Sequence, residues 1–195
     1  MPITPLHYPL AFALSKTNKK LLLPGVVVGA VIPDIEVPFM WIFFNDLPDH
    51  LILHSLVGAV TVGTLLAVVV TWLFYPPIIS TIFRVNKDEL MEVCTPSAML
   101  FLSCLIGVLS HLLLDYPMHW FNPILWPWVN PYDVVGPLVL FFAPFGPINR
   151  TAFWMANRLT SAIMILAWIP ILVYYQNNDL WTNHWLGGSR LEPSQ

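Results

Sequence analysis

The stretch SAMLFLSCLIGVLSHLLLD, residues 97–115, decides the fold class of this chain. It is almost entirely apolar until His111 and Asp115 close it. A helix that crosses the hydrocarbon core of a bilayer needs about 20 mostly apolar residues, and this stretch has about that length. It therefore predicts a transmembrane helix that carries a histidine and a carboxylate near one end.

Three further stretches, 21–44, 51–75 and 152–175, meet the same criterion. The first is interrupted by prolines and by Asp34 and Glu36, and a broken helix is tolerated in a membrane only where it lines protein or a water-filled cavity. With 57% hydrophobic residues and a mean hydropathy of +0.70, the chain is too apolar for an ordinary soluble domain. We predict an all-α integral membrane protein with about four transmembrane helices and short re-entrant or interfacial helices.

The segments between the spans have distinct compositions. Residues 117–150 hold seven prolines, which exclude a long helix, and several Trp and Tyr residues, which are typical of the membrane interface. We interpret 117–150 as an interfacial cap with a re-entrant apolar piece near 138–142. Residues 78–96 are expected to form a polar loop and residues 176–195 a polar tail. Residues 1–195 are expected to form one membrane-embedded domain, without a cleavable signal peptide.

The few ionisable residues are placed unusually. Only 10% of residues are charged, yet several histidines and acids lie in or beside the apolar stretches. Ionisable groups inside a membrane are costly and usually serve a function. Histidines and carboxylates without a matching supply of buried lysine indicate metal binding first. With four spans, the polar residues of separate segments fall near one depth, and these residues are His7, Asp34, His54, His111 and Asp115.

The strongest motif is Ser110-His111-Leu112-Leu113-Leu114-Asp115. Residues four apart on a helix lie on one face, so His111 and Asp115 could bind the same cation or pair of cations. The alternative is an ordinary hydrogen bond between the two side chains inside a helical bundle. His119 continues the four-residue spacing, but Pro117 should disturb the helix there, which makes His119 a poorer candidate.

The second motif is Asp49-His50-Leu51-Ile52-Leu53-His54-Ser55. If the helix begins here, His50 and His54 share one face, as the two histidines of H-E-x-x-H metal sites do. His54 lies deeper in the apolar run and is the better ligand. His50 could equally be a solvated loop residue.

The third motif is Gly29-Ala30-Val31-Ile32-Pro33-Asp34-Ile35-Glu36. Asp34 and Glu36 could hold one metal jointly, or divide between ligation and general-base catalysis. They could also form a polar helix end that faces the lipid headgroups. The small residues Gly25 and Gly29 predict that another helix approaches closely.

The ordered combination of these motifs resembles the membrane-bound metal-dependent hydrolases, a family of inner-membrane proteins described as LexA-binding. The resemblance covers about residues 1–130, with Glu36 where the family usually has Asp and with His50-Leu51 in place of its His-Arg pair. The matching pieces are Thr4-x-x-His7, Ile32 to Glu36, His54-Ser55-Leu56, Ser110 to Asp115 and Leu125-Trp126-Pro127.

The resemblance implies a metal-dependent hydrolase in the cell (inner) membrane that uses one or two divalent ions, most readily zinc. The implied metal ligands are His7, Asp34, His54, His111 and Asp115. Asp34 and Glu36 are the implied catalytic acids, and His50 and Arg158 are further candidates. Arg158 could meet an anionic substrate group or reach to the interface.

The substrate and the competing functions follow from weaker signals. The H-x-x-x-D element also resembles one in the helical zinc-dependent phospholipase C group, which makes a phosphoester, and at membrane depth a lipid, the expected substrate. A metal lowers the pKa of bound water toward about 7 and so supplies hydroxide for hydrolysis. The alternative is a metal-ion transporter or a metal-stabilised membrane scaffold, although the chain lacks the repeated halves of a transporter. The expected partner is the lipid bilayer; nucleic acid is not expected because no basic stripe is present.

Overall fold

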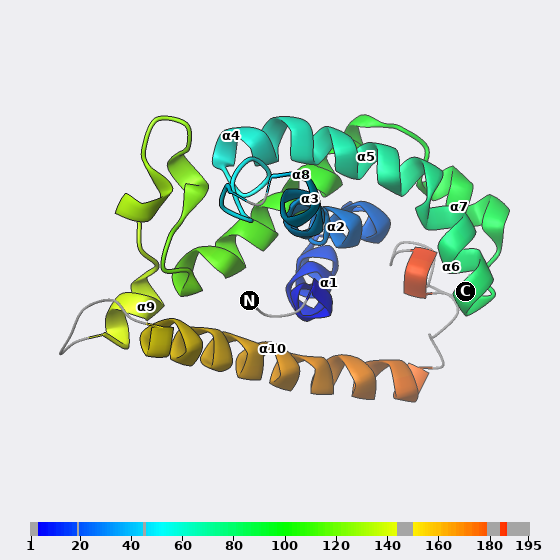
Figure 1. Cartoon of the computed structure of the whole chain (residues 1–195). Helices are drawn as coiled ribbons and strands as arrows, with labels where there is room; N and C mark the ends of the chain where they lie inside the picture. Colours follow the sequence, from blue (N-terminus) through cyan, green and yellow to red (C-terminus); the bar gives the residue numbers. More distant parts are fainter. Residues whose placement is uncertain (1–3, 19, 45, 144–149, 179–183, 187–195) are drawn as a thin grey trace.

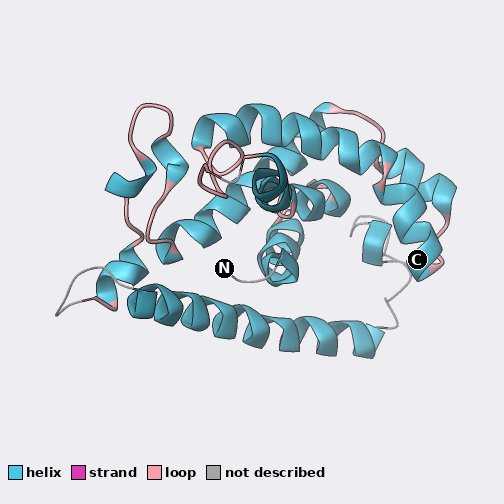
Figure 2. Cartoon of the chain, viewed as in Figure 1, coloured by secondary structure: helices cyan, strands magenta, loops and turns pink. Residues whose placement is uncertain are grey.

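The computed structural model describes residues 4–18, 20–44, 46–143, 150–178 and 184–186. Within these ranges the chain is helical and contains no strand (Figure 2). Four segments are long and apolar enough to cross a membrane, and they are Leu23–Phe43, Leu56–Leu73, Ala98–Met118 and Arg150–Gln176. The predicted all-α class and the four predicted spans are therefore confirmed.

The helical elements follow one another closely along the chain. The first half contains η1 (Thr4–His7), α1 (Tyr8–Thr17), α2 (Leu23–Gly29), η2 (Ile32–Ile35), α3 (Glu36–Phe43), α4 (Leu56–Gly58), the π-helical η3 (Ala59–Gly63), α5 (Thr64–Leu73), α6 (Tyr75–Phe83) and α7 (Lys87–Val93). The second half contains α8 (Ala98–Asp115), η4 (Tyr116–Met118), η5 (Pro123–Leu125), η6 (Pro131–Asp133), α9 (Pro137–Phe141), α10 (Arg150–Asn178) and η7 (His184–Leu186). In Figure 1, α5 and α10 run along opposite edges of the molecule, and α1, α2 and α8 lie between them.

The first span is broken where the sequence predicted it. Pro33 lies in the short 3₁₀ turn η2, which separates α2 from α3 and carries Asp34. The core around this break is built from Ile32 together with side chains of η3, α5 and α8 such as Ala59, Ala67 and Val108. The break is therefore enclosed by neighbouring helices, which is the condition under which a membrane protein tolerates one.

Helices α2 and α8 touch through their backbones. A Cβ atom added to Gly29 would overlap the carbonyl oxygen of Cys104 and would lie 3.0 Å from the Cα of Gly107. A Cβ atom added to Gly107 would overlap the carbonyl oxygen of Val26. The predicted close approach of a helix to Gly29 is confirmed, and only glycine allows it at these two positions. This contact sets the distance between the break after α2 and the last turns of α8.

We expect Gly107→Ala to destabilise the protein by about 1–3 kcal/mol, because the added methyl group must push α2 away from α8. Thermal unfolding in detergent measures the change. Gly63→Ala is the matched control, since its Cβ would lie at an ordinary 3.5 Å from the nearest atom, the carbonyl oxygen of Gly58. Equal unfolding temperatures for the two variants would contradict this packing role.

The second span begins later than the sequence predicted. The apolar run from Leu51 was expected to be helical, but the helix begins at Leu56, and Ser55 caps it by accepting a hydrogen bond from the backbone N–H of Gly58 at 3.1 Å. Residues 51–54 form a non-helical turn, because Glu36 accepts the hydrogen bonds that their backbone N–H groups would otherwise make in a helix. Within the 78–96 stretch, most residues belong to α6 and α7 rather than to a loop.

The cap over the end of α8 matches its predicted character. Residues 117–143 contain short helical turns and no long helix, and α9 occupies the predicted re-entrant piece. Side chains of α9 and of the start of α10 pack around Met118. The prolines at 144 and 147 lie outside the described residues, as does most of the predicted polar tail, of which the structure describes residues 176–178 and 184–186.

Candidate metal centre

The five predicted metal ligands come together from four separate segments. His7 ends η1, Asp34 lies in η2, His54 ends the turn before α4, and His111 and Asp115 lie in the last turns of α8. His111 is fully buried, and the side chains of His7 and Asp115 are almost as inaccessible. We call these five residues, together with His50 and His119, the His/Asp cluster.

The ligand atoms form two sets that share one residue. Asp34, His50, His54 and Asp115 make the first set; His7, His111 and Asp115 make the second. Within each set, one ligand atom per residue lies within 4.8 Å of all the others. The shared Asp115 turns Oδ1 toward His7 Nε2 of the second set at 3.6 Å and Oδ2 toward His54 Nε2 of the first set at 3.9 Å. The arrangement therefore fits one ion or two ions bridged by Asp115.

The spacing of the ligand atoms suits a common cation. Two nitrogen ligands at about 2.0–2.1 Å from a tetrahedral zinc ion lie about 3.3 Å from each other. His54 Nε2 and His111 Nε2 are 3.3 Å apart, and His111 Nε2 is 3.6 Å from Asp34 Oδ1. Most ligand-atom separations in the cluster exceed the 2.7–3.2 Å of a direct hydrogen bond, so the side chains surround a point rather than pair with one another.

The cluster leaves many buried polar atoms without a hydrogen-bond partner. They are His7 Nδ1 and Nε2, Asp34 Oδ1, His50 Nε2, Asp115 Oδ1 and Oδ2, and His119 Nε2. Burying a carboxylate without a partner costs several kcal/mol, and the ion pairs described for these acids involve histidine only, with no Lys or Arg. A divalent cation would satisfy one nitrogen of His7 and His50 Nε2 together with the orphaned oxygens of Asp34 and Asp115, so the residues present fit a metal.

Four histidines are held by their Nδ1 atoms, and each turns Nε2 toward the cluster. A metal-binding histidine is commonly oriented in this way by a carboxylate or a backbone carbonyl. The contacts join His50 to Asp49 Oδ1 at 2.7 Å, His54 to Glu36 Oε2 at 3.0 Å, His111 to the Ala30 carbonyl at 2.9 Å and His119 to the Asp115 carbonyl at 2.9 Å.

Three histidines outside the spans, His7, His54 and His119, lie in surroundings that favour the neutral form, which is the form that binds metals. Burial, aided by the neighbouring His111, lowers the pKa of His7 to about 3. Burial also lowers the pKa of His54 well below its ordinary value, and it lowers the pKa of His119. A neutral imidazole offers a lone pair to a cation, whereas an imidazolium offers none. Their environment therefore favours ligation over salt bridges with the acids.

Glu36 has a different place from the one predicted. We expected a ligand or a general base, but Glu36 belongs to neither ligand set, and its carboxylate accepts hydrogen bonds from the backbone N–H groups of Leu51, Ile52 and Leu53. The Glu36 carboxylate also makes a fourth hydrogen-bond contact, between Oε2 and His54 Nδ1 at 3.0 Å. With these four donors the carboxylate has no free oxygen aimed at the cluster. Glu36 thus fixes the 51–54 turn and orients His54.

We expect Glu36→Gln to weaken metal binding by about 10–100-fold, the usual effect of losing a residue that orients a ligand. The amide NH₂ would meet N–H donors where the carboxylate now accepts them, and the turn that carries His54 would shift. Competition with a fluorescent zinc chelator measures the affinity. The control is Glu89→Gln, a partly exposed glutamate in α7 that accepts a hydrogen bond from Asn86. An affinity in Glu36→Gln equal to that of Glu89→Gln would contradict the orienting role.

Sequence reasoning assigned no role to Thr4, although the T-x-x-H motif contains it. The Thr4 hydroxyl donates a 2.6 Å hydrogen bond to Asp34 Oδ2, and Asp34 Oδ1 then faces His111 Nε2. One turn of η1 thus supplies both a candidate ligand, His7, and the residue that orients another candidate, Asp34. The motif itself was the available signal, because a hydroxyl three residues before a predicted ligand can hydrogen-bond to a neighbouring ligand and orient it.

Thr4→Val, which keeps the shape of the side chain and removes the hydroxyl, is expected to lower metal affinity by about 10-fold or more. Thr4→Ser should retain the hydrogen bond and most of the affinity. The comparison of these two variants in the chelator titration isolates the hydroxyl. An unchanged affinity in Thr4→Val would show that Asp34 needs no such support.

His119 lines the pocket beside the ligands but belongs to neither ligand set, in keeping with its predicted status as a poorer ligand candidate. The regular helix does end at Asp115, but the 3₁₀ turn η4 continues the chain in a similar direction, so Pro117 does not carry His119 away. His50 also joins the cluster, with its ring 4.3 Å from that of His54 and 5.1 Å from that of His119. The predicted helical face shared by His50 and His54 is wrong, since both lie outside the helix.

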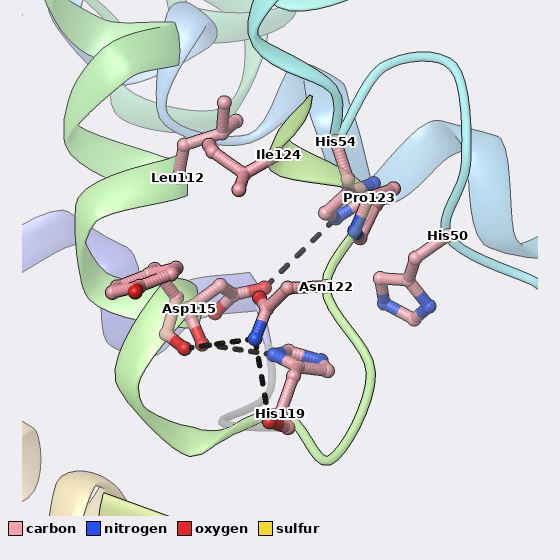
Figure 3. Close-up of a pocket in the computed structure, with 9 residues that line it drawn as sticks. His50, His54, Leu112, Asp115, His119, Asn122, Pro123 and Ile124 are labelled. Carbon is pink, nitrogen blue, oxygen red and sulfur yellow. Dashed lines mark hydrogen bonds and ion pairs between the residues drawn. The ribbon is translucent and has the colours of Figure 1, made fainter. Parts of the chain in front are cut away.

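A small pocket opens onto the cluster (Figure 3). His50, His54, Asp115 and His119 point into it, and Asn122 covers it by donating hydrogen bonds to the carbonyls of Tyr116 and His119. Its volume is about 10 Å³, which is room for about one water molecule. The cluster therefore adjoins a space of the size that a bound water or a single substrate oxygen needs.

Arg158 lies apart from this centre. It is exposed on α10, about two turns into the last span, where a long side chain can reach the interface. The structure does not bring it together with the His/Asp cluster.

Comparison with known proteins places the chain in a family. A family model described as YdjM inner membrane protein matches residues 7–181, which is most of the chain. The chain therefore belongs to this family and is an inner-membrane protein. No curated protein and no solved structure matches it. The family match confirms the membrane location that the resemblance of the motifs implied.

Proposed function

We propose that this inner-membrane protein is a metal-dependent hydrolase that cleaves a phosphoester of a lipid. The single observation that carries the proposal is the His/Asp cluster itself, with its seven buried polar atoms that lack hydrogen-bond partners, beside a pocket for about one water. A purely structural metal site is usually closed by its protein ligands, whereas a catalytic site keeps an open position. The pocket is that open position.

The ligands favour zinc over a hard cation. Imidazole nitrogen with carboxylate oxygen is the donor set that suits zinc, while magnesium and calcium prefer oxygen alone. His7, Asp34, His54, His111 and Asp115 would hold the metal, with His50 as a further ligand of the first set. When bound, the divalent ion would supply a nucleophilic water near neutral pH and would neutralise developing charge on a phosphoryl oxygen.

The chain's own residues would then position and move protons. Asp115, shared by both ligand sets, would keep two cationic positions at a fixed separation. Glu36 and Thr4 would hold His54 and Asp34 in their orientations. His119 belongs to neither ligand set, yet its unpartnered Nε2 faces the pocket, so it is the group placed to accept a proton from water there.

The test compares hydrolysis with transport. Purified protein in nanodiscs is given zinc and a panel of lipid phosphoesters, and the same protein in proteoliposomes is assayed for zinc uptake. The proposal expects phosphoester turnover that a chelator abolishes and zinc restores, without uptake. Uptake without turnover would identify a transporter instead, and bound zinc with neither activity would identify a metal-stabilised scaffold.

A further inference from the structure

An apolar groove lies between α3 and α5, on the other side of the 51–54 turn from the metal centre. We call it the α3–α5 groove; it is lined by Phe39, Met40, Leu51, Leu53, Val62 and Leu66 among other apolar residues. Its volume is about 430 Å³, within the roughly 300–1,000 Å³ typical of sites for small molecules. The one acidic residue in its wall, Glu36, directs its carboxylate to the turn.

The groove opens sideways into the bilayer. Its walls belong to two of the candidate spans, Leu23–Phe43 and Leu56–Leu73. Phe39 and Val62 are each about half exposed, at 50% and 53%, so the rim of the groove continues into the lipid-facing surface. The ligand that the hydrocarbon core offers to such a groove is a lipid acyl chain.

The groove residues of the second candidate span lie within its first half. At about 1.5 Å per residue, Leu66 is about 15 Å along the helix from Leu56, where the span begins. This is about half of the roughly 30 Å hydrocarbon core. An acyl chain in the groove would therefore lie beside the first half of this span.

The groove and the metal centre share the 51–54 turn. Leu51 and Leu53 line the groove, whereas His54 faces the small pocket, which is too small to admit an acyl chain. A lipid whose chain fills the groove has its polar end at the turn, where His50 lines the mouth of that pocket. We propose that the α3–α5 groove binds an acyl chain of the substrate lipid and presents its phosphoester to the metal centre, an inference that rests on the proposed function.

The chain-length dependence of turnover tests this role. Val62→Trp would fill the groove, and Val69→Trp places the same bulk two turns further along α5, at an exposed position outside the groove. With zinc-loaded protein, Val62→Trp should lower kcat/KM for a long-chain phospholipid by about 10-fold or more and leave a short-chain, water-soluble phosphoester unaffected. Val69→Trp should change neither. Equal losses on both substrates, or equal effects of both variants, would overturn the inference while leaving the hydrolase intact.

A second measurement does not depend on turnover. The protein is reconstituted in vesicles of phosphatidylethanolamine and phosphatidylglycerol with a photoreactive diazirine on the phosphatidylglycerol acyl chain, and crosslinked peptides are mapped by mass spectrometry. Crosslinks should fall on peptides of α3 and α5 and be lost in Val62→Trp but not in Val69→Trp. Crosslinks there without hydrolysis of any phosphoester would support the lipid site and refute the proposed function. Crosslinks spread evenly over the lipid-facing helices would refute the groove.

Discussion

His111→Ala and Asp115→Ala are each expected to remove most of the bound metal. His111 contributes Nε2 to the second ligand set, and Asp115 is the residue that both sets share. One rigid helix presents both side chains, so no other segment can move to replace them. The loss of affinity should exceed the roughly 10–100-fold that changes in orienting residues cause. Metal content of the purified variants, measured by mass spectrometry, gives the result.

Two controls accompany these variants. Asp133→Asn changes an exposed carboxylate in the cap, and His184→Ala changes a histidine that the sequence places in the polar tail beyond the last span. Both should retain full metal occupancy. Circular dichroism in detergent confirms that His111→Ala and Asp115→Ala remain helical. Full occupancy in both cluster variants would remove the basis for the metal centre.

His119→Gln is expected to lower kcat by about 10²–10⁴-fold, the usual contribution of a group that transfers a proton, while bound metal stays unchanged. The sequence indicated His119 only as a poorer ligand candidate, but the structure shows its Nε2 unpartnered at the pocket. Glutamine keeps a similar length and cannot accept a proton near neutral pH. Turnover of the phosphoester and metal content are measured on the same sample.

The two readouts of His119→Gln distinguish its roles. Loss of metal together with loss of turnover would make His119 a ligand. Unchanged turnover with unchanged metal content would show that His119 does not transfer the proton. Another residue of the pocket would then do so, and His50 is a second histidine there. Lower turnover with full occupancy is the result that the proposed function requires.

Local sequence signals predicted the parts of the protein that depend on local geometry. The apolar run that ends at His111 and Asp115 predicted a span with both side chains on one face, because helix periodicity fixes that relation. Pro33 predicted the break in the first span. Gly29 predicted the close approach of a second helix. In these cases the structural effect depends on the geometry of a single helix or on the small size of one residue.

The remaining features depend on contacts between distant residues. Leu51, Ile52 and Leu53 read as the start of a span, yet Glu36, fifteen or more positions earlier, accepts hydrogen bonds from their backbone N–H groups and holds them in a turn. Thr4 donates a hydrogen bond to Asp34, 30 positions later in the chain. No periodicity or spacing encodes such pairs, so the roles of Glu36 and Thr4 could not be predicted from the sequence.

The most direct test of the central claim is X-ray absorption at the zinc edge of the metal-loaded protein. We predict a shell of nitrogen and oxygen ligands at about 2.0–2.2 Å, with the outer-shell scattering that imidazole rings produce, from at least two histidines. The imidazole signal should weaken in His111→Ala. A shell of oxygen ligands without imidazole scattering, or a spectrum that His111→Ala leaves unchanged, would contradict the assignment of the His/Asp cluster as the metal centre.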